Sequence, residues 1–176
     1  MQQFRIVRCT ALFAPPSPTQ PLTMTLDDRQ RNHCWLTFAA LMAVLMLLAW
    51  WRPLALPDEG RYAEIGRWML QSGDNLAPRL DGMPFFHKPP LLHWLQSGLF
   101  AMLGVSAWVA RMVPALHAGL MVLGLYLSVR HAEGETRARQ AMLVLGSSLG
   151  FLMGGQYVNH DMLVAAWIST AIWCMG

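Results

Sequence analysis

The sequence predicts an all-α integral membrane protein, a bundle of about four transmembrane helices with one long loop. Charged residues make up only 13% of its 176 residues, whereas soluble domains carry about 25%. The charges lie between long uncharged stretches, and about 18 or more consecutive apolar residues suffice for a membrane-spanning helix. We therefore expect spans at about 35–51, 112–129, 140–158 and 162–176.

The first predicted span carries aromatic residues at both ends. It begins at Trp35 and ends at Trp50 and Trp51, and such rings favour the membrane interface. The preceding residues, 1–31, are expected to form a disordered cytoplasmic N-terminus. The apolar run at their beginning is too short and too rich in proline for a secretory signal, and Met24 is an alternative start of translation.

Basic residues predict the orientation in the membrane. Residues 1–31 hold four arginines and the turn 130–139 holds three, whereas the six basic residues of the loop 52–111 are spread thinly. Arg and Lys gather on the cytoplasmic side, and long loops translocate largely regardless of charge. We therefore expect the N-terminus and the turn 130–139 in the cytoplasm, and the loop 52–111 outside.

The long loop contains two segments predicted as interfacial helices. Residues 57–73 ("PDEGRYAEIGRWMLQSG") start with a Pro-Asp pair and stop at a Ser-Gly pair, which are helix start and stop signals. Residues 91–105 ("LLHWLQSGLFAMLGV") are apolar, but such a helix is only about 22 Å long, against about 30 Å of hydrocarbon. Because His93, Gln96 and Ser97 share one face, an amphipathic helix in the interface fits better than a further crossing.

Three ionisable residues at predicted membrane borders are candidates for chemistry. Asp58 follows the first span, Lys88 lies in "PFFHKPP", and Asp161 follows the third span in "NHD". If 91–105 stays in the interface, all three lie on one side of the membrane, and if it crosses, Asp161 lies opposite. Each also has a purely structural interpretation, the two aspartates as helix caps and Lys88 as a lysine whose charge snorkels to the interface.

Two further patterns bear on packing and on cofactors. Gly146, Gly150 and Gly154 recur every four residues, which predicts a helix face that lets a neighbouring helix approach closely. The histidines show no ligand spacing, so we expect no cofactor. A divalent metal held by His87, His160 and the aspartates is an alternative. The net charge of +3 is too small to indicate a nucleic-acid partner.

These pieces occur together, and in this order, in one known family. The stretch "PDEGRYAEIGRWMLQSGDNLAPRLDGMPFFHKPPLLHWLQSGLFAMLGVSAWVARMVPAL" closely resembles the first extracytoplasmic loop of ArnT-like and protein O-mannosyltransferase-like membrane glycosyltransferases. The segment "NHDMLVA" resembles a later x-D-M-L motif of the same family, and the resemblance runs from about residue 30 to the end. Asn75 stands where the family usually has Trp, Met112-Val113 replaces Leu, and His87 departs from the usual residue before the lysine.

The resemblance implies a GT-C-type bundle and a multi-pass enzyme of the inner membrane whose catalytic loop is extracytoplasmic. Such enzymes move a sugar from a polyprenyl-phosphate carrier to an acceptor. The sugar is aminoarabinose and the acceptor lipid A in one branch, and mannose goes to protein Ser or Thr in the other. The site residues that it implies are Asp58 and Asp161 as catalytic carboxylates, and Lys88, Glu59, Arg61 and Tyr62 for the donor and its carrier phosphate.

The chemistry of such a transfer suits these residue types. The leaving polyprenyl phosphate gains negative charge as the sugar bond breaks, and a fixed cation such as Lys88 stabilises charge that grows in this way. The acceptor hydroxyl is a poor nucleophile, and a carboxylate such as Asp58 can take its proton. The expected reaction is a single displacement with inversion.

The last predicted span stops after 15 residues, at Gly176. We therefore expect the chain to be the N-terminal part of a larger enzyme, with residues 32–176 forming the start of its transmembrane domain. An inactive truncated fragment of such an enzyme is the alternative. A small channel or transporter subunit fits less well, because it would need polar residues inside the spans. Apart from His117, the polar residues of the predicted spans are mainly Ser and Thr.

Overall fold

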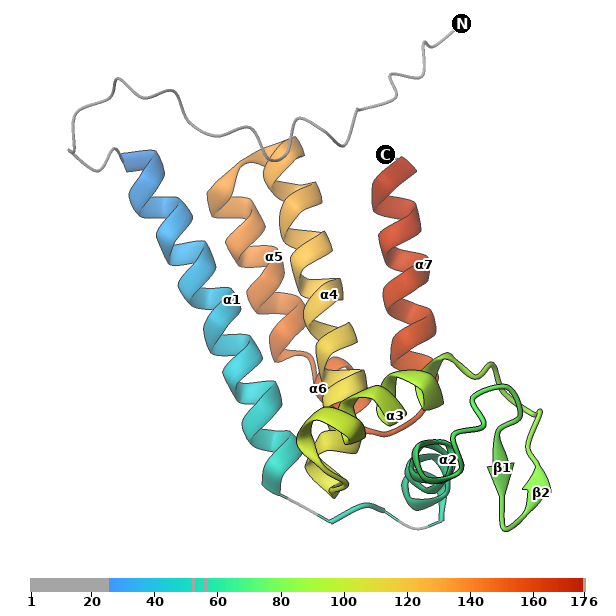
Figure 1. The fold of residues 1–176 in the computed structure, drawn as a ribbon. Coiled ribbons are helices and arrows are strands. Elements are labelled where there is room, and N and C mark those ends of the chain that lie inside the picture. The colour runs from blue at the N-terminus through green and yellow to red at the C-terminus, as the bar shows by residue number, and fades with distance from the viewer. Residues whose placement is uncertain (1–25, 52, 56, 176) are drawn as a thin grey trace, which may run out of the picture.

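The structure, a computed structural model, describes residues 26–51, 53–55 and 57–175. Helices dominate this part of the chain, with one short hairpin among them (Figure 1). The elements in order are α1 (Leu26–Trp51), α2 (Asp58–Ser72), β1 (Arg79–Leu80), β2 (Met83–Pro84), α3 (Leu91–Leu103), α4 (Ala107–Glu133), α5 (Glu135–Ser147), α6 (Leu149–Gln156) and α7 (Asp161–Met175). The two strands are antiparallel, with Arg79 opposite Pro84 and Leu80 opposite Met83.

The helices α1, α4, α5 and α7 run lengthwise, and the other elements gather at one end of them (Figure 1). α4 contacts α1, α5 and α7, and together these four helices form a bundle. The helices α2 and α3 and the β1–β2 hairpin lie at the end of the bundle where α1 stops and α7 starts. We call this the α2–α3 end, and the turn between α4 and α5 lies at the opposite end.

Two of the described helices are long and apolar enough to cross a membrane, judged by length and composition. They are Asp28–Trp51 within α1 and Ala107–Glu133, which is α4. The apolar helices α3 and α7 are shorter, with 13 and 15 residues. α3 lies across the end of the bundle rather than along it (Figure 1), which is the orientation expected of an interfacial helix.

The polar face of α3 is turned inward. His93, Gln96 and Ser97 are buried, and the side chain of Gln96 reaches the Ala110 carbonyl oxygen of α4 at 3.5 Å. Met102, on the other face, is 80% exposed. The amphipathic character expected for 91–105 is therefore present, but its polar residues contact protein together with Leu92 and Phe100, while other apolar residues, such as Trp94 and Met102, are exposed.

The helix α1 begins before the predicted first span. Residues 26–31 are helical, so the expectation of disorder up to residue 31 is wrong for these six positions. An ion pair of 2.6 Å joins Asp28 to Arg31 one turn later, and such pairs support the first turn of a helix. The remainder of the predicted disordered segment, with Met24, lies outside the described residues.

The segment predicted as one span at 140–158 is divided between α5 and α6. The backbone at Ser148 is extended, with φ −69° and ψ 131°. The hydroxyls of Ser147 and Ser148 donate back to the carbonyls of Val144 at 3.3 Å and Leu145 at 2.9 Å. Hydroxyls bonded in this way compete with the regular helical pattern, which accounts for the end of α5 and the restart as α6.

An apolar core lies between the lengthwise helices and α6. Its buried members include Leu45, Ala115, Ala118, Val122, Tyr126, Met142, Phe151 and Met162. The predicted close approach holds at two of the three spaced glycines, since a Cβ on Gly146 would lie 2.6 Å from Leu41 and one on Gly154 would lie 2.9 Å from Met162. Nothing lies within 4 Å of the same position on Gly150.

The contact between α2 and α3 depends on a glycine. A Cβ on Gly66 would lie 2.8 Å from the Cβ of Gln96, an atom fixed to the α3 backbone. We expect Gly66→Val to force the helices apart and to cost about 1–3 kcal/mol of stability, seen as a lower melting temperature in detergent. Gly98→Val on α3, where nothing lies within 4 Å, is the matched control, and an equal loss there would contradict this explanation.

Candidate active site at the α2–α3 end

Three segments meet at the α2–α3 end: the start of α2, the loop before α3 and the turn between α6 and α7. The backbone N–H of Val158 in that turn donates to Glu59 Oε1 of α2 at 3.1 Å. A ring nitrogen of His160 in the same turn lies 3.0 Å from the Pro89 carbonyl oxygen of the loop. These two long-range hydrogen bonds bring together the segments that hold the three candidate residues.

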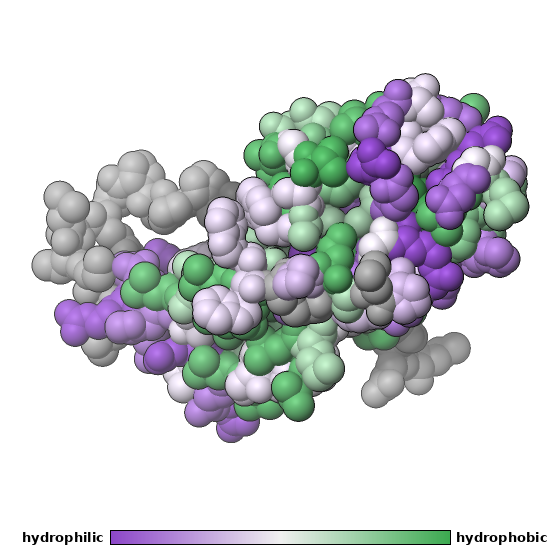
Figure 2. Space-filling view, turned by 90° about the horizontal axis from the view of Figure 1, so that it is seen from below, coloured by the Kyte–Doolittle hydropathy of each residue, from purple (hydrophilic) through white to green (hydrophobic). Residues whose placement is uncertain are grey.

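Polar and apolar surface are mixed at this end. Figure 2, which views the molecule from below, shows hydrophilic residues gathered on the side of α2 and the hairpin, with hydrophobic residues beside them. Exposed apolar side chains in this region include Leu76, Met83, Phe86 and Trp94. Such a surface is suited to the boundary between lipid and water, where aromatic and polar groups both find partners.

Asp58 is the first residue of α2 rather than its cap. The residue before it, Pro57, takes the capping position and makes no side-chain hydrogen bond there. The Asp58 carboxylate instead forms an ion pair with Arg61, one turn further along. The Asp58 side chain is 44% exposed, so the interpretation of Asp58 as a cap is wrong and its carboxylate is accessible.

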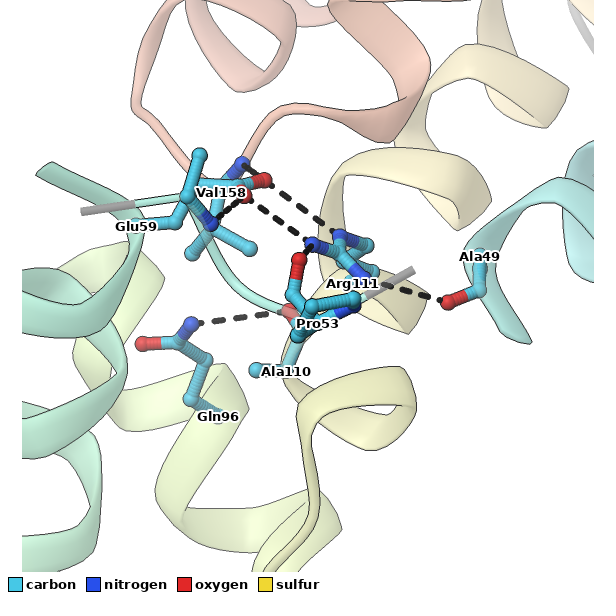
Figure 3. A network of polar contacts seen from close by, with 8 residues as sticks. Ala49, Pro53, Glu59, Gln96, Ala110, Arg111 and Val158 are labelled. Carbon is cyan, nitrogen blue, oxygen red and sulfur yellow. Dashed lines mark hydrogen bonds and ion pairs between the residues drawn. The ribbon is translucent and has the colours of Figure 1, made fainter. Parts of the chain in front are cut away.

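The next residue, Glu59, points inward and is fully buried (Figure 3). Its carboxylate pairs with Arg111 of α4, with Oε2 at 3.0 Å from Nη2 and Oε1 at 3.3 Å from Nε. It also accepts the backbone N–H of Ala55 at 2.5 Å and of Val158 at 3.1 Å. The carboxylate is therefore bonded to groups from three separate parts of the chain.

Arg111 extends the same network to the end of α1 (Figure 3). It donates to the Pro53 carbonyl at 2.7 Å and to the Ala49 carbonyl at 3.4 Å. A buried ion pair is tolerated when its remaining donors and acceptors are also bonded, and here backbone groups fill that need. The pair thus ties the end of α1, the start of α2, α4 and the turn before α7 together.

This environment changes the role of Glu59. A carboxylate that is buried and paired with Arg111 is not accessible to a phosphate, and two anions repel one another. Glu59 is therefore not retained as a phosphate-binding residue. Its contacts instead fit a positioning role, because it fixes the backbone directly beside Asp58.

Lys88 lies in an exposed loop between the hairpin and α3. At the start of this loop the Phe85 N–H donates to the Pro78 carbonyl at 2.7 Å. The Phe85 ring meets the rings of Tyr62 and His87 edge-on, at 6.4 Å and 5.0 Å between centroids. Helix α3 begins directly after the two prolines, so the loop is held at both ends while the lysine side chain remains accessible.

Asp161 is the first residue of α7 and is exposed. It exchanges two hydrogen bonds with Asn159: its N–H donates to Asn159 Oδ1 at 3.1 Å, and its Oδ2 accepts from Asn159 Nδ2 at 2.8 Å. The Asn159 side chain therefore serves the N–H at the helix start. This leaves the Asp161 carboxylate oriented and accessible to solvent.

Three rings pack together beside the Lys88 loop. The centroid of the Tyr62 ring lies 5.2 Å from that of His160 and 6.1 Å from that of His93, and the two imidazoles are 5.3 Å apart. The Arg61 guanidinium lies over the Tyr62 ring at 5.6 Å, a cation–π contact. Burial lowers the pKa of His160 and lowers the pKa of His93 to about 4, so both imidazoles are neutral at ordinary pH.

Metal ligands do not gather in the part of the chain that the structure describes. No three His, Cys, Asp or Glu side chains lie close enough there to hold a metal ion. The alternative of a divalent metal at His87 and His160 has no such cluster to support it. The accessible ammonium of Lys88 can bind an anion, and the accessible carboxylates of Asp58 and Asp161 can each accept a proton.

Comparison with known proteins identifies the family. A sequence profile of the dolichyl-phosphate-mannose-protein mannosyltransferase family matches residues 87–176, slightly more than half of the chain. The chain belongs to this family. The matched part of this mannosyltransferase-family chain includes Lys88, Arg111 and Asp161.

Two curated relatives of this family member are named for one and the same activity. It is similar to the undecaprenyl phosphate-alpha-4-amino-4-deoxy-L-arabinose arabinosyl transferase of Pseudomonas savastanoi pv. phaseolicola, with 34% identity over 84% of this chain and 28% of the relative. The transferase 2 of the same name from Pseudomonas fluorescens is 34% identical over 90% of this chain and 27% of the relative. The chain thus spans little more than a quarter of the length of these relatives.

The fold of this family member is similar to part of the fold of ArnT. The crystal structure of ArnT from Cupriavidus metallidurans bound to undecaprenyl phosphate matches with a TM-score of 0.76 and 29% identity, over 81% of this chain and 26% of that one. The apo state of the same protein matches with a TM-score of 0.71 and 28% identity, over 81% and 27%. The expected all-α GT-C-type fold is therefore confirmed.

Sequence reasoning missed the partner of Glu59 and the burial of His93 in this mannosyltransferase-family chain. Arg111 stands at the entry to a long apolar stretch, and an ionisable residue in such a place indicates a partner elsewhere in the chain. For His93 the signal was its position on the polar face of an otherwise apolar helix. That face marks where α3 contacts other protein segments.

Proposed function

We propose that this chain is part of an inner-membrane glycosyltransferase that moves aminoarabinose from a polyprenyl-phosphate carrier to lipid A at the outer face. The observation that supports it most directly is the similarity, over 81% of the chain, to an ArnT bound to undecaprenyl phosphate. The two relatives are also named for undecaprenyl phosphate and aminoarabinose. Asp58, Lys88 and Asp161, all from the α2–α3 end, supply the ionisable groups that such a transfer needs.

In this proposal Lys88 binds the carrier phosphate. Its side chain is exposed, and its loop is bonded to the rest of the protein on both sides of it, by Phe85 and by Pro89. Prolines at 89 and 90 restrict the backbone that follows the lysine. An ammonium held in this way at headgroup depth forms strong, charge-assisted hydrogen bonds to phosphate oxygens.

Asp58 acts as the base in the proposed transfer. The bond between the sugar C1 and the phosphate oxygen breaks, the phosphate keeps the electron pair, and Lys88 stabilises the charge that it gains. The acceptor oxygen bonds to C1 from the opposite face, which inverts the configuration, and its proton passes to Asp58. Arg61 orients the Asp58 carboxylate, the Tyr62 ring supports Arg61, and Asp161 is the second carboxylate of the site.

A second function is supported by the family itself. The profile that matches residues 87–176 is described for transfer of mannose from dolichyl phosphate to protein. The same Lys88 and Asp58 chemistry serves that reaction, because the carrier is again a polyprenyl phosphate and the acceptor again a hydroxyl. The two functions thus differ in donor sugar and acceptor.

The transfer is tested with membranes that contain the complete gene product. Undecaprenyl-phosphate aminoarabinose and lipid A are supplied, and mass spectrometry records both lipid A and the membrane proteins. We expect aminoarabinose on lipid A, whereas mannose on Ser or Thr of proteins, with a mannose donor, would favour the second function. If neither modification is found, the result favours the inactive-fragment alternative and contradicts both transfers.

The role of Lys88 has a separate test. We expect Lys88→Ala to weaken binding of undecaprenyl phosphate about 10- to 100-fold, because a hydrogen bond to a charged group contributes about 1.5–3 kcal/mol. Binding is measured by titration of the complete gene product in detergent. Arg79→Gln removes a cation of the hairpin whose guanidinium bonds the Gly82 carbonyl at 3.3 Å, and it should bind as the wild type does. Unchanged affinity of Lys88→Ala would contradict the assignment.

A further inference from the structure

A pair of buried imidazoles supports the loop that contains Lys88. His93 of α3 is fully buried, and His160 of the turn before α7 is 5% exposed. Their ring centroids are 5.3 Å apart, and the ring of Tyr62 from α2 packs against both. Three elements thus enclose two titratable side chains that the proposed transfer chemistry does not use.

One nitrogen of His160 holds the loop in place. Nε2 lies 3.0 Å from the Pro89 carbonyl oxygen, and because a carbonyl only accepts, Nε2 donates the hydrogen. Nδ1 is buried and has no hydrogen-bond partner among the described residues. The neutral ring with its hydrogen on Nε2 satisfies this geometry, whereas the charged ring would bury an unpaired N–H group, which is costly.

His93 reinforces the preference for neutral rings. Neither of its ring nitrogens has a hydrogen-bond partner of good geometry in the described part of the chain, although the Tyr62 backbone and the Gln96 side chain act on its pKa. Burial, and then the neighbouring His160, lower the pKa of His93 to about 4. A second charge in this enclosure would also repel the first.

The charged groups around the pair come from three elements. Lys88 of the loop disfavours a proton on His160, and Asp161 at the start of α7 favours one. Arg61 of α2 lies on the ring of Tyr62, and α3 contributes the neutral Gln96. A proton on His160 would therefore add a positive charge close to Lys88 while weakening the enclosure that holds the loop.

We propose that neutral His160 is a positioning residue for Lys88, and that protonation of the His93–His160 pair in acid releases the loop and weakens binding of the carrier phosphate. The inference rests on the proposed role of Lys88 in that binding. An exposed histidine has a pKa of about 6.5, so once the loop is released and exposes them, His93 and His160 take up protons below that pH, while the packed pair resists them. Acid therefore draws the equilibrium toward the released loop as the pH falls from about 6.5 toward 4.

The test compares two replacements of His160 in the complete gene product, titrated in detergent with undecaprenyl phosphate. His160→Leu removes the bond to Pro89, and we expect about fivefold weaker binding near pH 7.5. His160→Gln keeps an N–H donor of similar reach but does not titrate. We expect it to bind almost as the wild type does near pH 7.5.

The pH dependence separates a positioning role from a merely structural one. Between about pH 7.5 and 5.5, on either side of the ordinary histidine pKa, the wild type should lose at least about threefold more affinity than His160→Gln. Titration of the phosphate itself, near pH 6, affects both proteins equally and cancels. His131→Gln, at the opposite end of the bundle, is the matched control and should keep the full wild-type pH dependence.

Hydrogen exchange of the amides of residues 85–88 reports on the loop without any carrier. We expect faster exchange in His160→Leu, and in the wild type near pH 5.5 after correction for the intrinsic rate.

If Lys88→Ala binds normally while exchange responds in this way, the proposed function fails and the loop support stands. Wild-type pH dependence in His160→Gln would overturn the inference, and so would unchanged affinity and exchange in a folded His160→Leu. His160→Gln decides if His160→Leu does not fold.

Discussion

We expect Asp58→Asn to reduce sugar transfer by the complete gene product at least about 100- to 10,000-fold, the usual contribution of a positioned general base. Asparagine has nearly the shape of aspartate but cannot take the proton of the acceptor hydroxyl. The Asp58 carboxylate is 44% exposed and contacts Arg61 on its own helix, so the substitution leaves no buried charge behind. The measurement is transfer to lipid A in membranes.

Two comparisons make the Asp58 result specific. Binding of undecaprenyl phosphate to Asp58→Asn should stay close to wild type, because the base acts on the acceptor and Lys88 on the carrier. Asp81→Asn is the matched control at the same end of the molecule: Asp81 has a φ of 50°, which asparagine also tolerates. Near-normal transfer by Asp58→Asn, or an equal loss in Asp81→Asn, would refute the role of Asp58 as the base.

The gathering of the candidate residues at one end was predictable from span parity. Asp58 follows α1 and Asp161 begins α7, so the two are on the same side if an even number of crossings separates them. This required 91–105 not to cross, and a helix of 13 residues that lies across the bundle end fits that condition (Figure 1). The separation of apolar and charged stretches thus contained the coarse placement of the site.

The contacts inside the site were not predictable in the same way. Glu59 and Arg111 are 52 positions apart, and each has a local interpretation, Glu59 as a favourable charge in a first helical turn and Arg111 as a charge flanking a membrane span. Periodicity says which face of a helix is apolar, but not which distant residue meets it. The inward polar face of α3 and the His93–His160 pair were hidden for the same reason.

The hydropathy pattern also failed to predict two local features of the backbone, the β1–β2 hairpin and the break between α5 and α6. The hairpin was not predicted, although the Asp81-Gly82 pair that joins β1 to β2 is a turn signal. Around Ser148 the apolar residues resume after only Gly146 and two serines, so hydropathy averaged over the whole stretch predicts one helix. The break there depends on serine hydroxyls that bond back to carbonyls, a competition that hydropathy does not measure.

The stability effects of replacing Glu59 and Arg111, the buried ion pair, should be strongly coupled. Removing one partner leaves the other as an uncompensated buried charge, so we expect Arg111→Met or Glu59→Met alone to cost about 3–5 kcal/mol. The double variant Glu59→Met/Arg111→Met leaves no buried charge and fills a similar volume. It should therefore lose less stability than either single variant, as measured by unfolding of the protein in detergent.

An exposed ion pair provides the control for this comparison of single and double variants. Arg137 and Glu133 lie 3.1 Å apart at the opposite end, with side chains 68% and 56% exposed, and exposed pairs of this spacing couple by only about 0.3–0.5 kcal/mol. If the Glu59 and Arg111 losses simply add in the double variant, the two side chains do not act as a pair. Transfer is measured as well. A double variant that regains stability but not activity would show that the network also positions Asp58 and the turn before Asp161, because the methionine sulfur is only a weak acceptor for the Val158 N–H that joins α2 to that turn.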